Sequence, residues 1–160
     1  MLSFYVVSDA VAPGTRVDPL TCPPAMILSK LRDQNRLQNF LTAIGPERVY
    51  DGLGNCHEAC FALLADLSLA GQGLVKSWRW ATAMVAPSEK FVAHSHSWLE
   101  WHGTTGALRG WACDCGRGEE KVIFQRVAAY RALMKPRDLR LRNSFETARY
   151  IQQEAKKREG

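Results

Sequence analysis

The chain has 160 residues and a net charge of +5; hydrophobic residues make up 46% of it and charged residues 23%. These values suit a single globular domain over residues 1–160 with a sizeable core, and they exclude a chain that is disordered overall. No apolar run approaches the roughly 18–20 residues that span a bilayer, and the first residues lack the basic start of a signal peptide. We therefore expect a protein that works in the cytoplasm or is delivered to a host cytosol without a cleavable signal.

The first half of the chain is expected to contain one short strand and two helices. Residues 2–8 are rich in aromatic and β-branched types, which favours a strand, whereas the Pro residues of 9–25 favour a loop. Apolar side chains recur at helical spacing over 26–43 and again over 56–70. The second of these helices is the clearer one, because Asn55 before it is a good N-cap residue.

The second half is expected to form an antiparallel sheet followed by helices. Strand patterns cover 74–85, 91–101 and 108–113, with turns between them. Residues 122–134 and about 144–158 have a helical pattern, although the first of these segments could begin as a strand. This order predicts an α+β fold, in which N-terminal helices pack on an antiparallel β-meander and C-terminal helices follow.

Positive charge concentrates towards the C-terminus, where we expect a basic helix over about 137–158. The basic residues in and beside this segment are Lys135, Arg137, Arg140, Arg142, Arg149, Lys156, Lys157 and Arg158. Acidic side chains interrupt them, which favours a solvated helix face. A module that binds nucleic acid or an acidic protein without catalysis stays open as an alternative.

Cysteine carries the most informative chemistry, and the five cysteines are Cys22, Cys56, Cys60, Cys113 and Cys115. Their number is odd and no export signal precedes them, so free thiols, a metal site or a catalytic thiol are favoured over a disulfide framework. Cys56 stands at the expected helix start, where partial positive charge and unpaired N–H groups favour a thiolate and can hold an oxyanion. Cys60, one turn further along the apolar stripe, is expected in the core.

A thiolate nucleophile needs a base that can later act as an acid, and a third group that orients this base. His96 lies on an expected strand 40 residues after Cys56, and Asp114 lies 18 residues further on, at the end of the next strand. Adjacent antiparallel strands can bring two such side chains together. His57, which follows Cys56 directly, is expected to be an exposed residue of the first helical turn.

Three short motifs follow one another along the chain, and both their order and their spacing are informative. They are Gly54-Asn55-Cys56, His96-Ser97-Trp98-Leu99-Glu100 and Trp111-Ala112-Cys113-Asp114. Together they resemble the transglutaminase-like branch of the papain-like cysteine protease superfamily, in which a Gly-x-Cys helix start precedes a His-Ala-Trp-x-Glu strand and a strand that ends in Asp. The resemblance implies a papain-like fold with Cys56 as nucleophile, His96 as general base and acid, and Asp114 as orienting carboxylate. It favours His96 over His94 as the base, and Ser97 stands where Ala is usual.

The family contains proteases, amidases, deamidases, acyltransferases and transglutaminases. The resemblance therefore implies a cysteine-dependent hydrolase or acyltransferase that acts on an amide bond of a protein or peptide through a thioester, without a cofactor. Asn55, Trp80 and Trp98 are candidates for substrate binding or for the oxyanion site. Core packing beside the site is the plainer expectation for Trp98.

A zinc-binding structural domain is the main alternative to an enzyme. Its ligands would come from the cysteines and nearby histidines, which are Cys56, Cys60, Cys113, Cys115, His57, His94 and His96. The C-x3-C and C-x-C spacings differ from the CxxC knuckles that are usual in zinc sites. This difference disfavours a metal centre.

Overall fold

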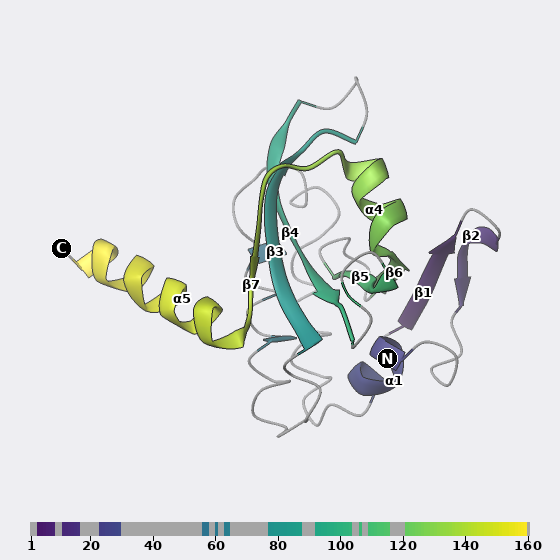
Figure 1. Ribbon diagram of the computed structural model, residues 1–160, viewed down its shortest axis with the longest axis horizontal. Coiled ribbons are helices and arrows are strands. Elements are labelled where there is room, and N and C mark those ends of the chain that lie inside the picture. The colour runs from purple at the N-terminus through teal and green to yellow at the C-terminus, as the bar shows by residue number, and fades with distance from the viewer. Residues whose placement is uncertain are drawn as a thin grey trace.

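The computed structural model describes residues 3–8, 11–16, 23–29, 56–57, 60, 63–64, 77–87, 92–103, 106, 109–115 and 121–159 (Figure 1). The elements with defined bounds in these ranges are β1 (Ser3–Ser8), β2 (Val11–Arg16), α1 (Pro23–Ser29), β3 (Trp78–Val85), β4 (His94–Trp101), β5 (Trp111–Asp114), β6 (Lys121–Arg126), α4 (Val127–Met134), β7 (Arg137–Arg142) and α5 (Ser144–Glu159). Cys56, His57, Cys60, Leu63 and Leu64 are also α-helical. Within the described ranges, no helix is long and apolar enough to cross a membrane.

The strands form one seven-stranded sheet in the order β2-β1-β6-β5-β4-β3-β7. From β6 to β7, every neighbouring pair of strands is antiparallel, whereas β1 lies parallel to β6. Strands β3 and β4 pair over their full length, from Trp78 opposite Trp101 to Val85 opposite His94. The fold is therefore of the α+β class, and β4 occupies an interior position in the sheet.

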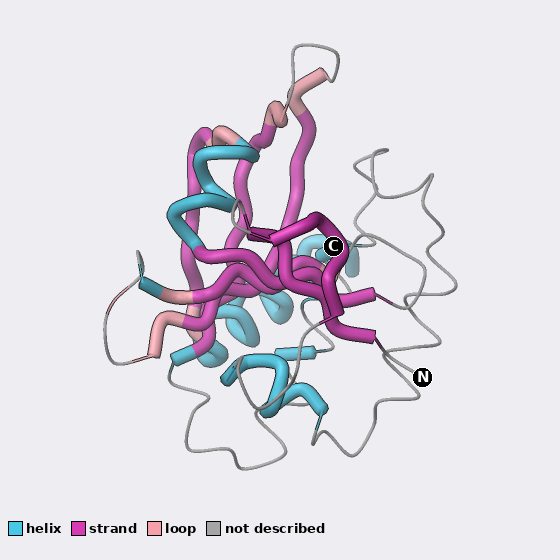
Figure 2. Tube along the Cα trace, turned by 90° about the vertical axis from the view of Figure 1, so that its right-hand side faces the viewer, coloured by secondary structure: helices cyan, strands magenta, loops and turns pink. Residues whose placement is uncertain are grey.

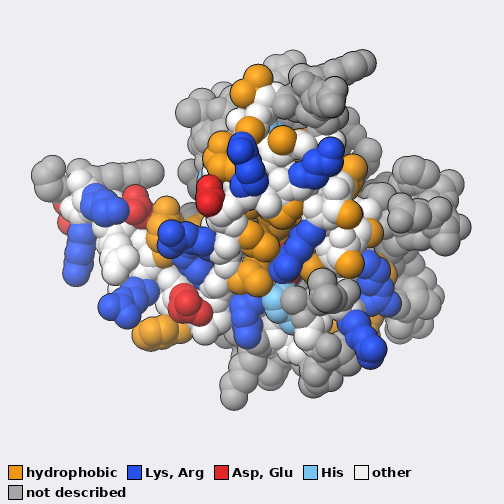
Figure 3. All heavy atoms as spheres, turned by 45° about the horizontal axis from the view of Figure 1, so that its top comes forward, with side chains coloured by type: hydrophobic (Ala, Val, Ile, Leu, Met, Phe, Trp, Pro, Cys, Tyr) orange, Lys and Arg blue, Asp and Glu red, His pale blue; other side chains and the backbone are white. Residues whose placement is uncertain are grey.

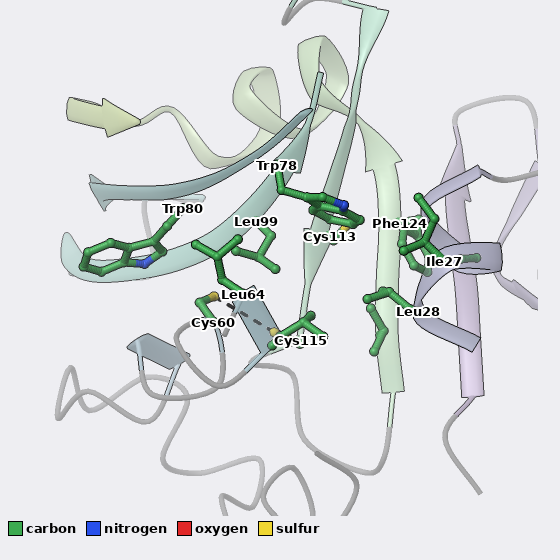
Figure 4. Packing of buried hydrophobic residues seen from close by; sticks show 13 residues of the cluster. Ile27, Leu28, Cys60, Leu64, Trp78, Trp80, Leu99, Cys113, Cys115 and Phe124 are labelled. Carbon is green, nitrogen blue, oxygen red and sulfur yellow. Dashed lines mark hydrogen bonds between the residues drawn. The ribbon is translucent and has the colours of Figure 1, made fainter. Parts of the chain in front are cut away.

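Helices lie on both sides of the sheet (Figure 2). A separate apolar cluster of buried side chains forms on each face. On one face, Trp78 and Leu99 pack with the helical residues Cys60, Leu63 and Leu64 (Figure 4). On the other face, α4 contributes its three buried residues to a cluster with β3, β4 and β5; these residues are Val127, Tyr130 and Met134. Side chains of a strand alternate between faces, so β4 can send neighbouring residues into two different environments.

A buried ionic group ties α4 to β4. Glu100 has no exposed surface, and its carboxylate accepts two hydrogen bonds from Arg131, at 3.0 and 2.6 Å. His102 Nε2 and Trp98 Nε1 complete its partners at 2.7 and 3.0 Å. Burial acts to raise the pKa of Glu100, but the hydrogen bonds from His102, Arg131 and Trp98 outweigh it and hold the pKa below its usual value. Glu100 is therefore an ionised core residue that depends on its partners.

Several expected elements are confirmed within the described ranges. Strand β1 falls in 2–8, strands β3, β4 and β5 fall at the three expected strands, and α5 matches the helix over about 144–158. The segment 122–134 begins as strand β6 and continues as helix α4. The expected helix over 26–43 is described only up to Ser29, and the rest of it lies outside the described residues.

The expected loop over 9–25 is wrong in two places. Val11–Arg16 forms β2, which is an edge strand, and an edge position tolerates Pro13 because one side of the strand makes no sheet hydrogen bonds. Pro23 and Pro24 open α1, where the missing N–H groups cost nothing, since the first helical N–H groups have no partner within the helix. Proline is thus accommodated within an edge strand and at a helix start, and it does not mark a loop at these positions.

The basic helix expected over about 137–158 is also wrong at its start, because Arg137–Arg142 forms strand β7. Lys135 adopts the left-handed conformation with φ 48°, which ends α4, and Pro136 cannot continue it. Leu139 and Leu141 pack against an apolar cluster, while the arginines alternate with them. On the face that Figure 3 shows, Lys and Arg side chains lie scattered among apolar and uncharged ones.

The ion pair between Glu100 and Arg131 yields the first prediction. Arg131→Ala leaves a buried carboxylate without its bidentate partner, and we expect the free energy of unfolding to fall by about 3 kcal/mol in urea denaturation. Arg149→Ala, which removes an exposed arginine of α5, is the matched control and should change it by less than about 0.5 kcal/mol. Equal losses in the two variants would contradict the dependence of the core on this pair.

Candidate active site at the end of strand β5

The site forms where β5 ends and β4 continues. Strand β5 ends at Asp114, and it pairs with β4 only from Leu99 to Trp101. The first half of β4, which carries His96, therefore extends beyond the end of β5. His96 and Asp114 lie on the same face of the sheet, and His96 Nε2 is 3.1 Å from Asp114 Oδ2. Both side chains are almost completely buried.

Asp114 is held from a second direction by helix α4. The hydroxyl of Tyr130 donates a hydrogen bond of 2.9 Å to Oδ2, the same oxygen that His96 contacts. Tyr130 is 2% exposed, so this hydrogen bond forms away from water. One carboxylate oxygen thus fixes the imidazole of β4 relative to α4, and a charge-assisted hydrogen bond of this kind is stronger than a neutral one.

The environment of His96 keeps its ring protonated at neutral pH. Burial acts to lower the pKa of His96, but the charge and hydrogen bond of Asp114, together with the hydrogen bond and charge of Cys56, raise it to about 10. The ring also stacks on Trp98, with the centroids 6.0 Å apart and an angle of 27° between the planes. His96 is therefore protonated at neutral pH, and its ring is held by the hydrogen bond to Asp114 and by stacking on Trp98.

Cys56 lies against His96 from the helical segment. Cys56 is 4% exposed, and its proximity to His96 contributes to the raised pKa of that histidine. Nε2 of His96 is bonded to Asp114, whereas Nδ1 is buried and has no hydrogen-bond partner among the described residues. The Cys56 thiol therefore lies near a buried imidazole that Asp114 holds in place.

The second helical cysteine, Cys60, lies in a different environment. It is fully buried in the apolar cluster of Figure 4, with its sulfur 4.0 Å from that of Cys115. Burial, and then the neighbouring Cys115, raise the pKa of Cys60 well above its ordinary value. Cys56, Cys60, Cys113 and Cys115 are buried, and none of them forms a disulfide. Cys60 is thus a core residue, as the apolar stripe predicts.

The structure places His96 within hydrogen-bond distance of Asp114, and Cys56 close enough to His96 to influence its pKa. Asn55 lies outside the described residues. Trp98 and Trp80 are 0% and 2% exposed, so their burial gives no support to the substrate-binding role predicted for them. His94 is half-buried at the rim, with its ring 6.2 Å from that of His96.

Two residues of the site escaped the sequence analysis. Tyr130 reaches Asp114 across 16 positions of the chain, and no local motif signals that contact. His57, expected to be exposed, is instead half-buried and hydrogen-bonded to Ser97 and Ser95. The sequence offers one indication that His57 belongs to the site, which is its place directly after Cys56.

Among the residues that the structure describes, no three His, Cys, Asp or Glu side chains gather closely enough to hold a metal ion. The chain matches no protein-family model, no curated protein and no solved structure to which it was compared. Any function must therefore be inferred from the arrangement of its own side chains.

The raised pKa of His96 predicts how stability changes with pH. The pKa is about 10 in the folded protein and 6.5 ordinarily, so the stabilisation from protonated His96 is complete below about pH 6.5 and is lost as the pH rises towards 10. We expect the free energy of unfolding to fall across this window more steeply than in His96→Gln, by up to about 1.4 kcal/mol per pH unit. Urea denaturation in reducing buffer measures this, and parallel curves for the two proteins would refute it.

Proposed function

We propose that the protein is a cysteine-dependent hydrolase or acyltransferase that acts on an amide bond of a protein or peptide. The observation that carries this proposal is the position of His96, which is bonded through Nε2 to the buried Asp114 and influenced by the Cys56 thiol. A nucleophile, a proton carrier and an orienting carboxylate in contact are what this chemistry needs. The proposal includes a papain-like, transglutaminase-like core around the antiparallel strands.

The protonated state of His96 defines the first chemical step. Cys56, as a thiolate beside the imidazolium, attacks the amide carbon, and the carbonyl electrons move to oxygen to give a tetrahedral intermediate. His96 then gives its proton to the leaving nitrogen as the C–N bond breaks, which leaves a thioester on Cys56. His96 therefore begins the cycle as an acid rather than as a base.

The second half of the cycle returns the proton. Neutral His96 accepts a proton from water or from an incoming amine, which attacks the thioester and releases the thiolate of Cys56. Water gives hydrolysis or deamidation, and an amine gives acyl transfer. Asp114 and Tyr130 keep the ring in one orientation through both halves, because the imidazole exchanges charge without losing its hydrogen bond to Oδ2.

Thiol labelling tests the proposed site without knowledge of the substrate. We expect iodoacetamide at pH 6 to modify Cys56 first in the folded wild-type protein, as identified by peptide mass spectrometry. His96→Ala removes the cation beside the thiol, so it should slow this labelling at least about tenfold. Asp114→Asn should slow it to a smaller extent, because the ring keeps its place but loses the charge that favours its protonated form.

His94→Ala is the matched control, since it removes a neighbouring histidine of the same strand. It should leave the labelling rate within about twofold of wild type, a change smaller than about 0.5 kcal/mol. The proposal is wrong if Cys56 reacts no faster than Cys22 or Cys60 and His96→Ala changes nothing.

A further inference from the structure

A second network of polar side chains lies directly beside the proposed catalytic residues. His57 follows Cys56 in the chain, and its ring nitrogens contact the hydroxyls of Ser97 and Ser95, the latter at 3.4 Å. The ring meets Trp80 edge-on, with the centroids 6.2 Å apart. The indole nitrogen of Trp80 also lies 3.0 Å from Ser97 Oγ. The mechanism above uses none of these groups.

One hydrogen-bond direction in this network is fixed by chemistry. The indole nitrogen of Trp80 can only donate, so Ser97 Oγ accepts a hydrogen bond there. The Ser97 hydroxyl still has a proton and a second lone pair, so it can pair with His57 Nδ1 in either tautomer of the ring, and His57 Nε2 pairs with Ser95 Oγ in the complementary direction. Burial, and then the charge of His96, lower the pKa of His57, in agreement with a neutral ring.

The network links the chain neighbours of the nucleophile to those of the proton carrier. Ser95 and Ser97 flank His96 on β4, and strand alternation directs them to the opposite face of the sheet. His57 therefore anchors the helical segment to one face of β4, while His96 occupies the other face. Ser95, His96 and Ser97 all lie in the part of β4 that does not pair with β5.

Ser97 gives this arrangement a signature in the sequence. The motif that this strand resembles has Ala at that position, where no hydroxyl could reach a neighbouring ring. The side chain that departs from the motif is fully buried and is the one that joins His57 to Trp80. A buried hydroxyl is retained at little cost only when its hydrogen bonds are made, and His57 is the partner in one of them.

We propose that His57 is a positioning residue which, through Ser95 and Ser97, sets the distance between the Cys56 thiol and the His96 ring. This inference rests on the proposed function. It adds a hydrogen-bond network that keeps the Cys56 thiol and the His96 ring at a fixed separation. Reaction geometry is sensitive to displacements of about 1 Å, which can change a rate by up to about a hundredfold. Loss of the network should therefore act on the reactivity of Cys56 more than on the fold.

The test compares alkylation of Cys56 by iodoacetamide at pH 6 with the thermal unfolding midpoint of each variant. His57→Ala and Ser97→Ala should each slow alkylation about tenfold or more, and the double variant should be no slower than either, because both changes remove one hydrogen bond. His57→Asn should recover most of the rate, since its amide group can pair with the Ser97 hydroxyl in place of Nδ1, as acceptor or as donor.

Trp80→Phe is the control for a merely structural role. It removes the indole donor and lowers stability but leaves the Ser97–His57 hydrogen bond in place, so alkylation should stay within about threefold of wild type, a change below about 1 kcal/mol. If alkylation in all five variants follows the unfolding midpoint, the positioning role is refuted. Should His57→Ala not fold, Ser97→Ala against Trp80→Phe makes the same comparison.

His96→Ala separates this inference from the proposed function. Slow alkylation in His96→Ala together with a wild-type rate in His57→Ala and Ser97→Ala would overturn the positioning role alone. A wild-type rate in His96→Ala would overturn the catalytic site, and the positioning role with it.

Discussion

One buried oxygen atom, Oδ2 of Asp114, is the point on which the site depends. It accepts hydrogen bonds from His96 on β4 and Tyr130 on α4, and both donors lie in the protein interior. A buried carboxylate is tolerated only when its hydrogen bonds are made, so the sheet and α4 must meet in one arrangement. Glu100 and Arg131 repeat this solution further along the same two elements. The orientation of the His96 ring and the docking of α4 are therefore consequences of the same buried carboxylates.

Strand β4 serves the site with both of its faces. One face carries His96 towards Asp114, and the other carries Ser95 and Ser97 towards His57. Strand alternation alone provides this double use. In this part, β4 has a sheet neighbour on one side only, because it pairs with β3 over its full length while β5 ends early at Asp114.

The catalytic candidates could be predicted because they depend on local chemistry and order along the chain. A cysteine at an expected helix start and a histidine and an aspartate on adjacent strands are visible without coordinates. Strand β7 is too short for its alternation of arginines with Leu139 and Leu141 to stand out from the charged residues that follow it. A continuous run of charge resembles a solvated helix until the sheet edge that receives the strand is known. Tyr130 was missed for a related reason: its partner is set by how α4 crosses the sheet, and periodicity alone does not determine this.

Cys56 and Cys60 stand one helical turn apart and carry the same functional group, yet they have different surroundings. Cys60 lies among apolar side chains and another thiol, where an ionised sulfur would be poorly solvated. Cys56 lies near the His96 ring, whose partner is a buried carboxylate. One helical segment thus presents the same side chain to an apolar cluster and to a polar pair, and a single turn of helix separates the two environments.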